Sequence, residues 1–291
     1  MASSAPILQF QGKTSPYKYT EIASNVIKRQ GGDDCFTALK DGFYDLQNLR
    51  YDALKWQELG TIFNLCENST VTKSSDVDDL IGLLSDSIGT MAMVNYPYET
   101  NFVNPLPAWP IKAGCDAAAA VSTAGDLKAA NVSIFDFTNI KKIQAMGKTF
   151  YNYDDSKECL NLAGDPSSGL DDNGWGVQTC NEFPMPMGDD ATNTCFTWTN
   201  WDKNAFTAGC QSAYNMTPKY DWALDYFGGR NPEKDFAQAS NLMFVNGDLD
   251  PWHGGGVNKN ITDNTIALFI KDSAHHLDLR LPNIDDPVTV T

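Results

Sequence analysis

The sequence lacks several features that mark common protein classes. No apolar run approaches the roughly 20 residues that a membrane-spanning helix needs. The first residues, MASSAPILQF, have neither the basic start nor the long apolar stretch of a secretory signal peptide. No C-x-x-C pair is present, which argues against a zinc ribbon or a thioredoxin-like redox motif. The 291 residues are enough for one large globular domain or two modest ones.

Basic residues are also scarce. The chain has 21 Lys and Arg against 37 Asp and Glu, which gives a formal net charge of −16. A nucleic-acid partner is therefore not expected, because contacts to phosphate need Lys and Arg. The acidic surface fits two alternatives, simple solubility or an acidic compartment in which carboxylates are partly protonated.

The cysteines and the sequons favour a secretory or lysosomal protein. The seven cysteines are widely spaced, as in chains with long-range disulfides: Cys35, Cys66, Cys115, Cys159, Cys180, Cys195 and Cys210. Four N-x-S/T sequons predict N-glycosylation sites at Asn68, Asn131, Asn215 and Asn260. Asn215 is a poor acceptor because Pro218 follows its sequon. This leaves Asn68, Asn131 and Asn260 as the expected glycosylation sites.

The first half of the chain is predicted to be mainly helical. A short buried strand is expected at Ala5–Phe10, from the apolar run APILQF. Apolar residues then recur at three- and four-residue spacing, and Ser75 or Asp76 is a candidate N-cap. Prolines and aromatic residues interrupt this pattern over residues 95–110. The expected helices cover residues 19–30, 35–49, 76–94 and 137–153.

The second half has a different pattern. Residues 164–176, GDPSSGLDDNGWG, predict a turn-rich loop, and helical stretches follow near residues 203–213 and 219–227. The runs NLMFVNG (241–247) and NTIALFIKD (264–272) predict two buried strands. Together these patterns predict an α/β core that carries a helical cap.

Acidic and histidine side chains follow the two predicted late strands. Asp248 and Asp250 follow the first, and His275 and His276 follow the second. The remaining histidine of the chain, His253, also follows the first strand. Functional groups gather at the carboxyl ends of strands in α/β sheets. An Asp before a His also matches the Ser, Asp, His chain order of α/β-hydrolases. In such a site the Asp orients the imidazole, and the imidazole accepts the proton of a serine hydroxyl.

Two other interpretations of these residues remain open. An Asp and a His at strand ends often only cap turns or face solvent. A metal site is the other alternative, since Asp and His are suitable ligands. However, no H-E-x-x-H or comparably compact spacing is present, so a metal is not expected. The metal candidates would be Asp248, Asp250, His253, His275 and Asp278.

The sequence resembles one known family along nearly its whole length. The motifs NGDLDPWHGGGV, ITD and AHHLDLR resemble the C-terminal signature of the serine peptidases that include lysosomal Pro-X carboxypeptidase and dipeptidyl peptidase II. The segments ASSAPILQF, AMVNYPYETNFVNPLPAWPIKAGC, YNYDDSKECLNL and GWGVQTCNEFPMPM resemble further family segments in the same order. The segment PLPAWPIK is closer to the Pro-X carboxypeptidase side of the family.

The resemblance implies an α/β-hydrolase that cleaves peptides next to proline and needs no cofactor. By motif, Asp250 is the implied catalytic aspartate and His275 the implied catalytic base. Trp252 and Met185 are implied as walls of the proline-binding pocket, although core packing is an equally simple explanation of either side chain. His276 is expected to be a structural neighbour, and the role of His253 stays open.

The resemblance also implies a domain division and a disulfide pattern. Residues 1–15 would be the hydrolase strand after the nucleophile elbow, 16–153 a large helical insertion (cap) domain, and 154–291 the C-terminal part of the hydrolase domain. The implied disulfides are Cys35–Cys115, Cys66–Cys159 and Cys180–Cys210, which leaves Cys195 unpaired.

A nucleophile motif is missing. No G-x-S-x-G is present, so we expect the serine to lie outside these 291 residues and the chain alone to be inactive. Either the sequence is part of a serine peptidase with proline-containing peptide substrates, or it is a short non-catalytic relative that binds such peptides or is inert. A purely structural glycoprotein is a further alternative. For the peptidase we expect a lysosomal or secreted location, an acidic pH optimum and a possible homodimer, with no membrane partner.

Overall fold

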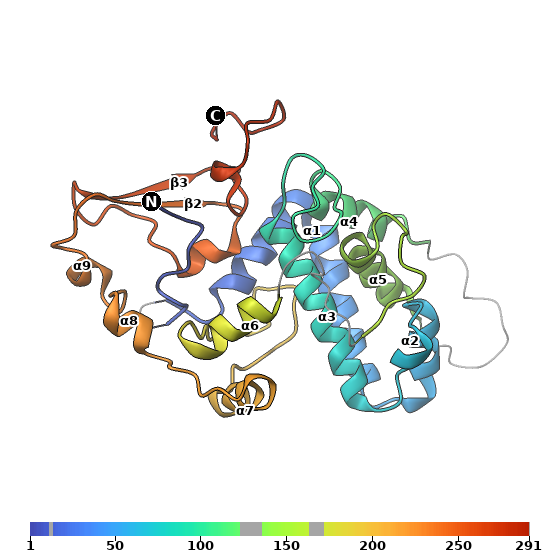
Figure 1. Cartoon of the computed structure of the whole chain (residues 1–291). Helices are drawn as coiled ribbons and strands as arrows, with labels where there is room; N and C mark the ends of the chain where they lie inside the picture. Colours follow the sequence, from blue (N-terminus) through green and yellow to red (C-terminus); the bar gives the residue numbers. More distant parts are fainter. Residues whose placement is uncertain (12–13, 123–135, 163–171, 291) are drawn as a thin grey trace.

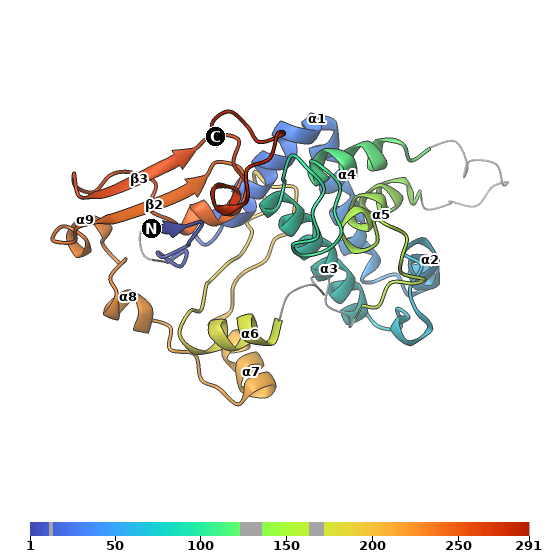
Figure 2. The same ribbon diagram turned by 45° about the horizontal axis from the view of Figure 1, so that its top comes forward.

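The computed structural model describes residues 1–11, 14–122, 136–162 and 172–290. It combines a small parallel sheet with a larger set of helices. Figures 1 and 2 show the strands at one end of the molecule and helices α1 to α5 at the other. We call residues 18–119 and 138–151 the helical region, and residues 2–11 and 241–281 the sheet region. No helix in the described ranges is both long and apolar enough to cross a membrane.

The sheet joins the start of the chain to its end. Its strands are β1 (Ala2–Ser3), β2 (Leu242–Gly247) and β3 (Thr265–Ile270), in the order β1-β2-β3. All pairs are parallel, with Ala2 opposite Phe244 and Leu242 opposite Thr265. Because parallel strands end at the same edge of a sheet, the segments that follow β2 and β3 meet there.

Two predictions about the strands are wrong. The expected strand Ala5–Phe10 is not a strand, and β1 lies earlier, at Ala2–Ser3. Pro6 cannot donate a ladder hydrogen bond, and Gln9 and Phe10 have φ of 52°, so the chain turns there. The strand at 264–272 is present but not buried throughout, since Leu268 and Phe269 are 46% and 48% exposed. Among the described residues no further strand pairs with β3, so it is an edge.

The helical region packs five helices around one core. They are α1 (Lys18–Leu49), α2 (Trp56–Ile62), α3 (Ser74–Met93), α4 (Pro110–Ala119) and α5 (Thr138–Tyr151). Short 3-10 turns lie at Ala53–Lys55 and Glu67–Ser69. The apolar faces that the three- and four-residue spacing predicts meet in the interior. Fully buried members include Leu39, Phe43, Leu84, Ile88, Met146 and Phe150.

The predicted helices 19–30 and 35–49 form one long element with a kink. Gly32 has φ of +83° and ψ of 174°, and it breaks the helical geometry inside α1. Glycine adopts this conformation without the steric penalty that a Cβ atom brings. The first part of α1 therefore reaches the sheet region, while its second part belongs to the helical core.

The ends of the predicted helices needed correction. The N-cap of α3 is Lys73 rather than Ser75 or Asp76. Asp76 instead occupies the third helical position, where its carboxylate accepts from the backbone N–H of Thr72 and Lys73. These bonds lower the pKa of Asp76. Helix α4 was not predicted, because its small residues give little apolar periodicity.

Between residues 172 and 241 the chain forms four short helices before the sheet returns. They are α6 (Asp172–Asn181), α7 (Lys203–Tyr214), α8 (Trp222–Tyr226) and α9 (Pro232–Asp235). The expected loop 164–176 is therefore wrong from Asp172 onward, and its residues up to 171 lie outside the described part. Helix α7 begins at an N-cap, Asp202, whose carboxylate accepts from the N–H of Asn204 and Ala205.

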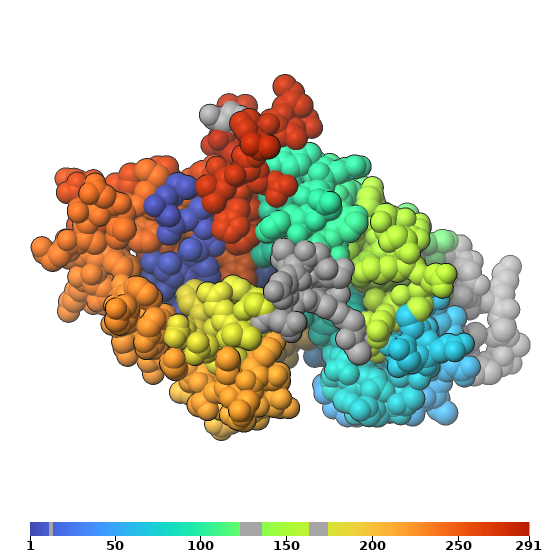
Figure 3. Space-filling model, in the orientation of Figure 1, coloured from blue at the N-terminus to red at the C-terminus, as the bar shows by residue number. Residues whose placement is uncertain are grey.

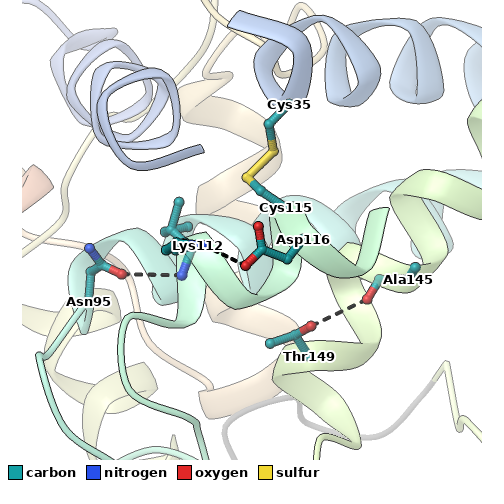
Figure 4. Close-up of a disulfide and its surroundings, with 8 residues drawn as sticks. Cys35, Asn95, Lys112, Cys115, Asp116, Ala145 and Thr149 are labelled. Atoms are coloured by element: carbon teal, nitrogen blue, oxygen red, sulfur yellow. Dashed lines mark hydrogen bonds and ion pairs between the residues drawn. A yellow bond between two sulfur atoms is a disulfide. The ribbon is translucent and has the colours of Figure 1, made fainter. Parts of the chain in front are cut away.

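Three disulfides link distant segments. They are Cys35–Cys115, Cys66–Cys159 and Cys180–Cys210, which is the pairing that the family resemblance implies. The first joins α1 to α4, next to the Lys112–Asp116 ion pair on α4 (Figure 4). Cys195 is free and buried, and burial raises the pKa of its thiol to about 12. The disulfides Cys35–Cys115 and Cys66–Cys159 close long loops, since their cysteines are 80 and 93 residues apart.

The C-terminal segment crosses the boundary between the two regions. Figure 3 shows its red residues packed against the turquoise residues near position 100. Arg280 lies over the Tyr96 ring at 4.6 Å and donates to Thr100. These contacts connect the end of the sheet region to the helical region.

Candidate active site

Asp250 is placed by the turn that follows β2. The chain leaves the strand at Gly247 and enters the 3-10 helix η3 (Pro251–Gly255), for which Asp250 is the N-cap. Its Oδ1 accepts from the N–H of Trp252 at 3.0 Å, and its side chain is fully buried. Proline at the first helical position suits this start, since that N–H would be unpaired in any case. The turn therefore fixes the carboxylate and leaves Oδ2 available.

His275 is placed by contacts from the helical region. Its backbone N–H donates to the carbonyl of Met93 at 3.0 Å, and its carbonyl accepts from the Tyr96 hydroxyl at 2.6 Å. Gly247 makes room for this segment, because a Cβ there would lie 2.1 Å from the Ser273 carbonyl oxygen. The loop after β3 is thereby held close to the end of β2.

The structure brings Asp250 and His275 into direct contact. His275 Nδ1 lies 2.8 Å from Asp250 Oδ2, and the His275 side chain is 14% exposed. With the proton on Nδ1, the imidazole donates to the carboxylate and its tautomer is fixed. Nε2 has no hydrogen-bond partner in the part of the chain that the structure describes. The pair has the geometry of a general base with its orienting carboxylate.

The other two histidines have different surroundings. The ring of His276 lies 3.9 Å from that of His275, and its backbone N–H donates to Ser4 Oγ. The Ser3 hydroxyl donates to Asp278 and lies 3.4 Å from His276 Nδ1. Burial, and then the neighbouring His275, lower the pKa of His276. This histidine and the two serines therefore hold the loop after β3 rather than contact the Asp250 carboxylate.

His253 lies on η3 and faces the sheet. Its ring centroid is 5.0 Å from that of Phe269, and its Nδ1 is buried without a hydrogen-bond partner. Burial lowers the pKa of His253, while the charges of Asp250 and Asp248 oppose that shift. Within the described residues, no group of three or more His, Cys, Asp or Glu side chains could hold a metal ion.

Trp252 is the centre of an aromatic cluster beside the Asp250–His275 pair. Its ring lies 5.2 Å from Tyr19, 6.0 Å from Phe10, 6.0 Å from Trp175 and 6.5 Å from His275. Its indole N–H points to the Met93 sulfur at 2.8 Å. These contacts fix one face of the indole and place it next to the imidazole.

Met185 belongs to the segment that follows α6. Its side chain is 7% exposed, and it lies two residues before Met187. Met187, Trp252 and Trp175 line a shared cavity of about 450 Å³. The segment that holds Met185 is therefore close to the aromatic cluster.

An arginine from α1 ties the two loops of the site together. Arg29 forms ion pairs with Asp248, which follows β2, and with Asp272, which follows β3. The backbone N–H of Asp272 also donates to Asp248 Oδ1 at 2.6 Å. The three side chains therefore connect α1 to both segments that carry the Asp250–His275 pair.

Three of the four sequons fall within the described residues. Asn68, Asn215 and Asn260 are exposed, whereas Asn131 lies outside the described residues. The Asn260 side chain accepts from the N–H of Ala267.

Sequence reasoning missed several residues of the site. Arg29, Met93 and Tyr96 fix the loops, and Tyr19 and Trp175 complete the aromatic cluster. Each comes from a segment far from residues 250–275. The available signals were the family-like segments AMVNYPYETNFVNPLPAWPIKAGC, which contains Met93 and Tyr96, and GWGVQTCNEFPMPM, which contains Trp175.

Comparison of the sequence with known proteins finds one family. The family model described as "Serine carboxypeptidase S28" matches residues 1–291. The chain is 35% identical to a protein named "Lysosomal Pro-X carboxypeptidase" from Mus musculus, over 100% of this chain and 55% of that protein. The protein of the same name from Homo sapiens is 33% identical over 100% of this chain and 55% of its own length.

The match to a more distant relative covers a similar share of both proteins. "Prolyl carboxy peptidase like protein 5" from Caenorhabditis elegans is 29% identical over 96% of this chain and 55% of that protein. The chain therefore spans about half the length of the relatives that it matches.

Proposed function

Because the chain belongs to the S28 family of serine carboxypeptidases, we propose that it is part of a serine-type exopeptidase that cleaves next to proline. The activity that fits best is that of a Pro-X carboxypeptidase, which is the name of its mouse and human relatives. The observation that carries the proposal is the 2.8 Å contact between His275 Nδ1 and Asp250 Oδ2.

The proposed mechanism assigns one role to each group. Asp250 holds the His275 imidazole with its proton on Nδ1 and stabilises the imidazolium when it forms. Nε2 of His275 accepts the proton of a serine hydroxyl and later returns it to the leaving group. The serine lies outside these 291 residues, as the missing G-x-S-x-G motif suggests.

Proline is recognised, in this proposal, by the apolar surfaces beside the pair. Trp252 is the main wall because its indole lies next to His275. Met185 is the second wall, on the segment after α6. A flat aromatic surface suits the pyrrolidine ring, which has no N–H to satisfy.

The proposed family function also assigns a role to the sheet region and to the helical region. We propose that β1 to β3 belong to an α/β-hydrolase sheet and that residues 16–153 form a helical cap beside its active site. The bonds of Met93, Tyr96 and Arg29 to the loops after β2 and β3 support this arrangement. Residues 1–15 and 154–291 would then be the hydrolase part.

A lysosomal or secreted location is proposed for the same protein. The mouse and human relatives are named as lysosomal, and disulfides persist in such oxidising compartments. Proline-containing peptides would be its substrates. Asn68 and Asn260, which fall within the described residues, would be glycosylation sites.

The experiment uses the full gene product that contains these residues. It is incubated with Ala-Pro-Phe, and the products are separated by mass spectrometry. His275→Ala and Asp250→Asn should each lower kcat/KM by about 10⁴-fold or more. The control is His253→Phe, which leaves the Asp250–His275 contact in place and should change kcat/KM by less than about 10-fold. Full activity in His275→Ala would overturn the proposal.

Blocked peptides separate the alternatives, because both activities cleave the Pro–Phe bond of Ala-Pro-Phe and release the same products. Cleavage of N-acetyl-Ala-Pro-Phe but not of Ala-Pro-Phe-amide identifies a carboxypeptidase, and the reverse preference identifies a dipeptidyl peptidase II-like enzyme. Binding of the peptide with no cleavage by the full gene product would identify a non-catalytic relative.

A further inference from the structure

One residue at the end of α3 contacts both the proposed base and the proposed proline wall. The backbone carbonyl of Met93 accepts from the N–H of His275 at 3.0 Å. The sulfur of the same residue accepts from the Trp252 indole N–H at 2.8 Å. His275 follows β3 and Trp252 lies on η3, so Met93 connects two segments that are separate in the chain. The proposed mechanism gives no role to the Met93 side chain.

The helical core fixes the position from which the Met93 sulfur acts. Met93 is the last residue of α3, and its neighbours Ala92 and Val94 are fully buried in that core. The N–H of Val94 donates to the Thr90 carbonyl and continues the helical pattern past Met93. The core therefore sets the backbone of Met93, while its side chain leaves the helix toward Trp252.

The same helix also holds a second neighbour of the indole. The Tyr19 hydroxyl donates to the Gly89 carbonyl at 3.3 Å, and Gly89 lies about one turn before Met93. The Tyr19 ring packs edge-on against Trp252 at 5.2 Å. The last turn of α3 therefore contacts the indole through the Met93 sulfur and, indirectly, through Tyr19.

The ring contacts of Trp252 do not by themselves choose between the two edges of its indole. Rotation about the bond between Cβ and the ring has two broad minima, which exchange the edge that carries the N–H. Packing against neighbouring rings depends mainly on shape, whereas a hydrogen bond depends on direction. The Met93 sulfur accepts from this N–H, so it determines which edge of the indole faces α3 and which face stands beside His275.

We propose that Met93 is a positioning residue for proline recognition, because its sulfur orients the Trp252 indole as the flat wall against which proline packs. The inference rests on the proposed peptidase function and adds a residue to its specificity. The bond from the Met93 backbone to His275 is present whatever side chain stands at position 93. A side-chain substitution should therefore change proline recognition and leave the base unchanged.

The first experiment measures proline preference in the full gene product, as the ratio of kcat/KM for Ala-Pro-Phe to kcat/KM for Ala-Ala-Phe. Met93→Leu keeps the volume but lacks an acceptor, so it should lower kcat/KM for Ala-Pro-Phe about 5-fold, mainly through KM. Cleavage of Ala-Ala-Phe should change by less than about 2-fold, since alanine offers the indole little surface. The acid limb of the pH profile should not move, because the Asp250–His275 contact is retained. An unchanged preference or a shifted acid limb would overturn the inference.

Two further variants separate the sulfur from general packing. Met91→Leu makes the same change two residues earlier, at a side chain that is fully buried in the helical core, and should keep the parent preference. Met93→Gln offers an amide oxygen to the indole N–H, so its preference should lie within about 2-fold of the parent. Equal losses in Met91→Leu and Met93→Leu, or a lost preference in Met93→Gln, would overturn the inference.

A second measurement needs no turnover and decides the matter if Met93→Leu does not fold. Solvent exchange of the indole N–H groups is followed by NMR in the full gene product labelled with ¹⁵N-tryptophan. In the parent, Trp252 should exchange slowly, as Trp56 does, whose indole donates to the Leu49 carbonyl, and not rapidly, as the exposed Trp198 does. In Met93→Leu its exchange should approach that of Trp198.

The exchange rates also separate the inference from the proposed function. Exchange of Trp252 as fast as that of Trp198 in the parent would overturn the inference. Slow exchange of Trp252 with no proline-directed cleavage by the full gene product would instead overturn only the proposed function.

Discussion

The helical region and the sheet region keep their structure by different means. The helical region has one continuous apolar core and the Cys35–Cys115 disulfide between two of its helices. A second, smaller core cluster lies under the sheet and has four buried members, Leu8, Phe236, Phe244 and Val257. Apolar burial contributes roughly 25 cal/mol per Å², so the larger core contributes most to the stability. The candidate catalytic pair lies at the margin of the larger core, because its neighbours Leu249, Ala274 and Leu277 belong to that core.

Polar contacts from the helical region add to this packing at the candidate site. Met93 and Tyr96 bind the backbone of His275, and Arg29 pairs with an aspartate after each of β2 and β3. Hydrogen bonds and ion pairs define positions more narrowly than apolar contact does, because they depend on direction. The comparison shows that the helical region fixes the sheet edge that carries the Asp250–His275 pair through a few directional bonds.

The largest expected effect tests the apolar cores. Leu84 is fully buried in the helical region, whereas Leu268 on β3 is 46% exposed. Leu84→Ala should lower the free energy of unfolding by about 2–5 kcal/mol, and Leu268→Ala should change it by less than about 0.5 kcal/mol. Urea unfolding followed by circular dichroism measures both. Similar losses in the two variants would contradict the burial of Leu84 in the core and the exposure of Leu268 on the edge strand.

An intermediate effect tests the connection between them. Arg29→Ala should lower the free energy of unfolding by about 1 kcal/mol, since its partly exposed ion pairs are screened by solvent. Amide hydrogen exchange should become faster in β2 and β3 and stay unchanged in α3. Arg50→Ala is the matched control, because Arg50 pairs with Asp78 inside the helical region. Faster exchange in β2 and β3 of the control would show that Arg29 has no special role.

The smallest expected effect is a change in the pH dependence of stability, caused by histidines of the sheet region. All three histidines lie there, and burial lowers the pKa of His253 and His276 below the usual value of about 6.5. The unfolded chain therefore binds protons first, and stability falls as the pH drops from about 7 through 6.5 toward the lower folded pKa values. His253→Phe should make the fall in Tm between pH 7 and pH 5 smaller.

The parent protein is the control for the pH experiment. Burial raises the pKa of Asp189, which acts in the opposite direction but is the same in the parent and in His253→Phe, so it cancels in the comparison. An equal fall in Tm for the two proteins would show that His253 does not contribute.

Much of the secondary structure was predictable because the cause is local. Repeated apolar spacing predicted the long parts of α1, α3 and α5, and the short β-rich runs predicted β2 and β3. The strand at Ala5–Phe10 failed because Pro6 and the turn at Gln9 and Phe10 override the apolar run. Helix α4 was missed because small residues carry no pattern, although they pack well once α1 and α5 surround them.

The candidate site divides in the same way. The sequence by itself determined that an aspartate and a histidine follow two neighbouring strands, and that Trp252 stands beside the aspartate, because residue identity and strand periodicity are local properties. Only the tertiary structure decided the 2.8 Å contact of Asp250 with His275 and the bonds from Arg29, Met93 and Tyr96. These depend on how segments far apart in the chain pack in space, and no local pattern encodes that packing.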